Sequence, residues 1–249
     1  KLSRPELPPP LTAMRHFCLP RLAACVVLLA RAALGAERIT PAMAVRDLPT
    51  LARFLDEYDA NIKDRTGQTV VHWAASVGSG DAIDYAVEQG ADLSRVDVDG
   101  KAPLHVAALS GHAEAVGRLL ARRAAADARD RQGATPLHRA ALAGAAAATR
   151  LLAYAAPAAL DVRLARTEGT ALHSAAYLGH AAVLEELLAA GASPCVRNRN
   201  GNLPIDRYVE EDHDDVAEAY DELQVVDDAA RQRVFDILRT ASRRCGDDL

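Results

Sequence analysis

The feature of this 249-residue chain that most restricts its fold is an internal repeat of nearly constant period. Four stretches align, and each runs from a glycine through a histidine to a pair of alanines. The histidines, spaced 33, 33 and 35 residues apart, are His72, His105, His138 and His173. A degenerate fifth copy has Asp206 in the histidine position. Such a period indicates stacked units, none of which can bury its apolar side without neighbours.

Each copy has the composition of two short helices joined by a tight turn. Thr135 and Pro136 suit the N-cap and first position of a helix, with the threonine hydroxyl able to accept from a first-turn amide. Small alanines let neighbouring helices approach, and a glycine such as Gly144 permits the reversal. We expect the buried face of the second helix to carry the leucine pairs Leu119–Leu120, Leu151–Leu152 and Leu187–Leu188. The third copy is one residue short between its glycine and Leu151 and irregular over 154–168, which predicts a distorted hairpin.

These marks resemble the ankyrin repeat over about residues 40–240. The run Thr-Pro-Leu-His-x-Ala occurs unchanged at 135–140, and the Gly-His and Gly-Ala pairs recur in phase. An Asp-x-x-Gly turn recurs at Asp64–Gly67, Asp97–Gly100 and Asp130–Gly133. The resemblance implies an all-α ankyrin-repeat solenoid of stacked helix-turn-helix units joined by β-hairpin loops.

The same alignment predicts the domain organisation. A leader is expected at 1–36, an N-terminal capping repeat at 37–66 and a degenerate C-terminal capping repeat with an acidic insertion at 201–249. Between them lie four repeats, at 67–99, 100–132, 133–168 and 169–200. The insertion, 210–228, contains ten acidic residues and neither lysine nor arginine, and its apolar residues predict an amphipathic helix. A further helix is expected at about 229–241.

The leader has the parts of a secretory signal peptide. Met14 is the candidate start, a short charged segment follows, nine apolar residues run from 22 to 30, and small residues precede Glu37. The apolar run is too short to span a bilayer. We therefore expect the secretory pathway or extracellular space. The alternatives are an organelle transit peptide, a non-functional or mistranslated leader, and initiation at Met43, which would give a cytoplasmic protein.

Composition and motifs argue against several functions. Residues 37–249 hold 24 basic and 33 acidic residues, a net charge of −9 that disfavours nucleic acid as a general partner. Cys195 and Cys245 are expected to be plain thiols, although an oxidising compartment would permit a bridge. The repeated histidines fall one per layer, too far apart to share a metal ion, and the acidic run lacks an EF-hand pattern. No nucleophile elbow or phosphate loop occurs, so we expect no enzyme and no cofactor.

The resemblance places binding on the concave face, at positions that differ between copies. Inner-helix residues and hairpin tips form the predicted partner-binding set: Trp73, Lys101, Leu109, Arg131, Arg139, Leu142, Arg166, Tyr177 and Arg199. We expect a monomeric scaffold that binds another protein, with the basic tips receiving an acidic segment of that protein or the chain's own insertion. The alternatives are the interaction module of an enzyme or larger protein, and nucleic-acid binding through the tips.

Overall fold

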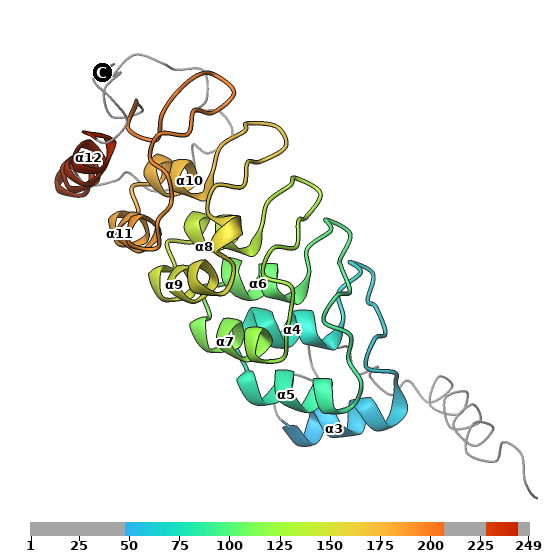
Figure 1. The fold of residues 1–249 in the computed structure, drawn as a ribbon. Coiled ribbons are helices and arrows are strands. Elements are labelled where there is room, and N and C mark those ends of the chain that lie inside the picture. The colour runs from blue at the N-terminus through green and yellow to red at the C-terminus, as the bar shows by residue number, and fades with distance from the viewer. Residues whose placement is uncertain (1–47, 207–227, 244–249) are drawn as a thin grey trace, which may run out of the picture. The chain divides into compact units, whose positions relative to one another are not determined.

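The computed structural model describes residues 48–206 and 228–243. The expected leader, the start of the N-terminal capping repeat and the amphipathic helix within the acidic insertion lie outside these residues. The described chain is built from short helices and connecting loops (Figure 1). The helix expected at about 229–241 is present as α12 (Asp228–Ser242), and α3 (Leu48–Glu57) lies at the other end of the described chain.

The helices form two layers. The inner layer consists of α4 (Val70–Val77), α6 (Pro103–Leu109), α8 (Pro136–Leu142) and α10 (Ala171–Tyr177). The outer layer consists of α5 (Gly80–Glu88), α7 (Ala113–Ala121), α9 (Ala146–Ala155) and α11 (Ala181–Ala189). Successive helices within each layer pack side by side, and every inner helix packs on the outer helix of its own repeat. The hairpin loops extend from the other side of the inner helices (Figure 1), so the all-α repeat solenoid is confirmed.

Alanine and leucine make the core between these layers. Leu104, Leu137 and Leu172 of the inner helices are 0–1% exposed, and the alanine pair after each histidine is at most 1% exposed. Small alanines bring the helix backbones together, while Val71 of α4 and one buried leucine in each of the other inner helices fill the space between layers. Stability is therefore distributed over the junctions between repeats.

The expectation about the outer-helix leucine pairs is wrong in part. One leucine of each pair is buried, namely Leu119, Leu152 and Leu187, whereas Leu151 is 37% exposed. The third outer helix is not short, because its turn glycine and Leu152 have the same spacing as Gly111 and Leu119. The pair is displaced by one position, and the extra residues of this repeat follow the helix. They form the short helix η2 (Pro157–Ala159) and a lengthened hairpin.

The terminal helices cover the two ends of the stack. Helix α3 packs on α5 and buries Leu51 and Phe54, while Leu48 remains 43% exposed. Helix α12 packs on α11 through Val234 and Leu238, both fully buried. An ion pair of 2.8 Å from Arg233 to Glu185 joins the same two helices. Both contacts protect the apolar sides of the first and last repeats.

Candidate functional site

The repeated histidines link each repeat to the next. His105 Nδ1 accepts from the backbone N–H of Ala102, so the ring proton lies on Nε2, which donates to the carbonyl of Ala134 at 3.0 Å. His72 and His173 make the same bonds to the carbonyls of Lys101 and Asn202. Burial lowers the pKa of these rings and keeps them neutral. They are structural hydrogen-bonding residues.

His138 is the exception within this series. Its Nδ1 accepts from the Thr135 N–H, and the threonine hydroxyl donates to the same nitrogen at 2.9 Å. Its Nε2 has no hydrogen-bond partner in the described part of the chain, although the ring is fully buried. Burial lowers the pKa of His138 to about 4. The backbone of Gly169, the counterpart of Ala134, lies close enough to oppose this lowering of the pKa, but it completes no hydrogen bond of normal geometry with Nε2.

A second histidine position bonds in the opposite direction. His112 follows a turn glycine, and its Nε2 donates to the carbonyl of Ser76 in the preceding repeat at 3.0 Å. His180 donates likewise to the carbonyl of Leu142 at 3.3 Å. The His180 ring lies against Gly144, whose φ is +69° and where a Cβ would meet the ring at 2.9 Å. Side chain and glycine thus fit one another across the junction.

Turn aspartates organise the hairpins. The Oδ1 atom of Asp97 accepts from the backbone N–H groups two and four residues ahead, at 2.9 and 2.8 Å. Asp64, Asp130 and Asn198 make the same pair of bonds. The equivalent residue in the irregular hairpin is Leu164, which has no acceptor. There the chain closes instead through backbone bonds and the left-handed conformation of Glu168, φ +53°.

Arg139 is placed differently from the sequence expectation of an exposed contact. It is 9% exposed, and its guanidinium donates to Asp130 Oδ2 and to Gln132 Oε1. Burial opposes ionisation of Asp130, but the hydrogen bond and charge of Arg139 outweigh it, so the pKa of Asp130 is lowered. Trp73 uses the same position, donating from Nε1 to Asp64 Oδ2 at 2.9 Å with its ring half-buried. The nine-residue spacing from turn aspartate to inner-helix donor was the missed signal.

The remaining predicted apolar residues lie in one row. Leu109, Leu142 and Tyr177 each stand four positions after the histidine of their inner helix, and they form the apolar row. Leu109 is 41% exposed, while the other two are half-buried. Because the inner helices pack side by side, the row crosses the last three layers on one side, here called the inner-helix face. In the first layer the equivalent residue is Ser76, and Val77, one position further on, is 58% exposed.

The predicted basic residues lie on the hairpin tips. Lys101 is engaged with Asp99 at 2.9 Å, and its side chain is 22% exposed. Arg131, Arg166 and Arg199 are exposed. Backbone bonds join successive tips, from Ala165 N to Gln132 O and from Arg199 N to Thr167 O, at 3.0 and 2.9 Å. The structure therefore gathers these three arginines on neighbouring hairpins, beside the inner-helix face.

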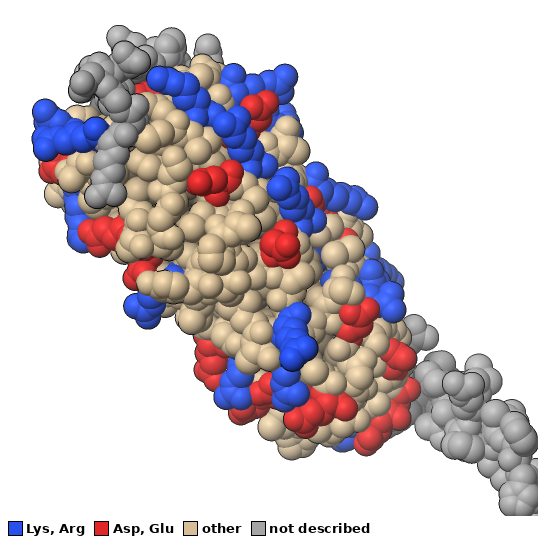
Figure 2. Space-filling view, viewed as in Figure 1, with Lys and Arg blue, Asp and Glu red and all other residues tan. Residues whose placement is uncertain are grey.

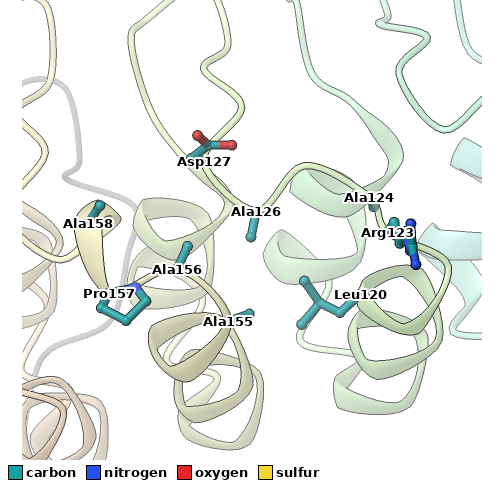
Figure 3. A pocket seen from close by; sticks show the side chains of 9 residues that line it. All are labelled: Leu120, Arg123, Ala124, Ala126, Asp127, Ala155, Ala156, Pro157 and Ala158. Atoms are coloured by element: carbon teal, nitrogen blue, oxygen red, sulfur yellow. The ribbon is translucent and has the colours of Figure 1, made fainter.

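An open groove of about 570 Å³ lies on the other side of the stack, between the ends of α7 and α9 (Figure 3). Alanines and Pro157 form most of its wall, Leu120 closes one side, and Arg123 and Asp127 stand at its edge. It arises where the lengthened connection leaves α9. Its lining offers shape and apolar surface but no arrangement suited to bond making.

Two findings concern metals and membranes. Over residues 48–206 and 228–243, no group of three or more His, Cys, Asp or Glu side chains is placed to hold a metal ion. None of the helices described here is long and apolar enough to cross a membrane.

Cys195 differs from the expected plain thiol. It is disulfide-bonded. The bond lies in the connection that leads into the last hairpin.

The comparison with protein families agrees with this architecture. The model for ankyrin repeats (3 copies) matches residues 42–130 and 118–198. The chain therefore belongs to the ankyrin-repeat family, whose repeats are generally protein–protein interaction modules on a typically non-catalytic fold. No curated protein matches the chain.

Proposed function

We propose that this protein is a non-catalytic scaffold that binds another protein through its inner-helix face. The observation that carries the proposal is the apolar row. Leu109 presents 41% of its surface and Leu142 and Tyr177 are half-buried, whereas the alanine pairs before them are at most 1% exposed. Apolar side chains aligned at the same place in successive repeats suit a protein surface that excludes water.

The proposed contacts differ from the sequence prediction at one position. Arg139 leaves the set because its guanidinium is committed to Asp130 and Gln132. Trp73, Leu109, Leu142 and Tyr177 stay as inner-helix contacts. Lys101, Arg131, Arg166 and Arg199 stay as contacts on the tips.

Affinity capture with the full chain tests this face. Leu109→Glu places a charge in the apolar row and should abolish capture of the partners that the wild type retains. Leu151→Glu is the matched control, because Leu151 is similarly exposed at 37% but lies on the outer helix α9. Capture lost with Leu151→Glu and kept with Leu109→Glu would assign binding to the outer face instead.

We also propose that the protein enters the secretory pathway through the leader that starts at Met14. The disulfide at Cys195 supports this, because disulfides persist in oxidising compartments and are rare in the cytosol. Amino-terminal sequencing of the mature protein should find a start near Ala36 or Glu37. A start at Met43 with a reduced Cys195 would place the protein in the cytoplasm.

A further inference from the structure

Two positions on the hairpins change character along the stack. Taken in repeat order, the residue before each turn residue is Lys63, Val96, Arg129, Arg163 and Arg197. The residues that follow are Arg65, Val98, Arg131, Ala165 with Arg166 beside it, and Arg199. The last three hairpins therefore each present two arginines. We call these six residues the arginine strip: Arg129, Arg131, Arg163, Arg166, Arg197 and Arg199.

The turn residue of each of these hairpins is either an acid, which offsets part of the positive charge, or a neutral residue, which does not. In the hairpin of Arg129 and Arg131 it is Asp130, whose carboxylate is buried against Arg139. In the next two hairpins it is Leu164 and Asn198, which are neutral. Asn198 still closes its turn through Oδ1, at 2.9 and 3.0 Å, so the acid is lost without loss of the turn. Positive charge accordingly accumulates toward the last hairpins.

The arginines of the strip are exposed and only partly engaged. Arg163 lies 3.5 Å from Glu168 with half of its side chain exposed. Arg197 donates to the carbonyl of Gly201 at 2.8 Å, and Arg199 donates weakly to the carbonyl of Arg166 at 3.4 Å. Carbonyl bonds orient a guanidinium without neutralising it, and its other N–H groups stay available for a carboxylate.

The second hairpin has the opposite character. Val96 and Val98 are 41% and 50% exposed at the equivalent positions, and Asp97 with Asp99 supplies negative charge around them. Figure 2 shows blue side chains along the hairpin edge, and red side chains mixed with blue ones at the end of α3 and α5. The second hairpin therefore separates the arginine strip from Lys63 and Arg65 of the first hairpin.

We propose that the arginine strip binds an acidic segment of a partner protein, running across the tips of the last three hairpins. This inference rests on the proposed protein-binding function and names the chemistry of the partner. A short carboxylate-rich segment fits the length of the strip. A long phosphate backbone would run on to the second hairpin, where Asp97 and Asp99 disfavour a nucleic acid.

The test uses the full-length protein and a fluorescein-labelled peptide of twelve glutamates, followed by fluorescence anisotropy. The variant Arg131→Glu/Arg166→Glu/Arg199→Glu should bind at least about tenfold more weakly than wild type, and its affinity should depend less on salt. The matched control is Arg53→Glu/Arg123→Glu/Arg150→Glu. These three arginines are exposed on other surfaces, and the change in formal charge is the same.

The proposal would be overturned if both triple variants weakened peptide binding equally. It would also be overturned if the wild type did not bind the peptide at low salt. Tighter binding of single-stranded DNA than of the peptide through the same arginines would assign the strip to nucleic acid. Stronger peptide binding after neutralising the acids of 210–228 would assign it to the chain's own segment. Loss of captured partners in Leu109→Glu with unchanged peptide binding separates this inference from the proposed face.

Discussion

The layers around His105 and His138 start from nearly the same sequence and end in different bonding. Leu-His-Val-Ala-Ala and Leu-His-Arg-Ala-Ala occupy equivalent inner helices, α6 and α8. His105 completes its bond to Ala134 in the next repeat, whereas His138 Nε2 has no partner within the described residues. Two additional residues before the next histidine account for the difference. A repeat therefore depends on its neighbour's length as well as on its own motif.

The apolar core should be equally important for stability in the layer of His105 and in the layer of His138. Leu104 and Leu137 are 1% and 0% exposed at equivalent positions. We expect Leu104→Ala and Leu137→Ala each to lower the free energy of unfolding by about 2–5 kcal/mol, because each leaves a cavity between repeats. Urea denaturation followed by circular dichroism measures this. A loss below about 0.5 kcal/mol at Leu137 alone would show that the irregular layer is loosely packed.

The layer of His138 should also be distinguishable by the pH dependence of the protein's stability. The pKa of His138 falls from 6.5 to about 4 on folding, so the unfolded chain binds the proton more readily. The stability contributed by the neutral His138 ring should be fully present above pH 6.5 and should be lost as the pH drops toward 4. The expected loss from this ring is about 3 kcal/mol. The aspartates with lowered pKa titrate below this window. Urea melts between pH 7 and 4 should show a shallower decline in His138→Gln, and an unchanged decline would exclude the ring as its source.

Substitution of the turn aspartates compares the hairpin of Asp130 with the hairpin of Asp97. Asp130→Asn retains the turn acceptor, as Asn198 shows, but leaves the buried Arg139 without its counter-charge. We expect a loss of about 1–3 kcal/mol. Asp97→Asn should cost less, because the inner-helix residue nine positions ahead is Val106, which donates no side-chain bond. Equal losses in thermal unfolding would mean that the turn, rather than the ion pair, sets the effect.

The smallest expected effect concerns the irregular hairpin. Glu168 occupies the left-handed region that glycine occupies in the regular hairpins, for example Gly100 at φ +77°. Glu168→Gly should raise stability by less than about 1 kcal/mol, since relief of strain exceeds the loss of an exposed ion pair to Arg163. A precise urea melt would detect it. A clear destabilisation would show that the ion pair or backbone entropy dominates.

Much of this fold could be predicted because its signals are local and repeated. The threonine-proline start, the histidine and the turn glycines placed the helices. Individual side chains were less predictable. The bond from Arg139 to Asp130 was missed, because their nine-residue spacing becomes informative only when the turn is known to fold back on its helix. The burial of the outer-helix leucines was mispredicted for a related reason. Which leucine of a pair is buried depends on its distance from the turn glycine and not on the pair itself.

The two sets of histidine bonds have a consequence for how the stack comes apart. The first junction has a bond in each direction, from His72 to Lys101 and from His112 to Ser76. The repeat at 133–168 has Ala145 where His112 and His180 stand, and His138 Nε2 completes no bond of normal geometry, so each junction beside this repeat retains one histidine bond. Nearest-neighbour coupling is thus uneven. Under mechanical tension or partial denaturation, the chain would unzip in stages, with the third repeat as the boundary between two cooperative segments.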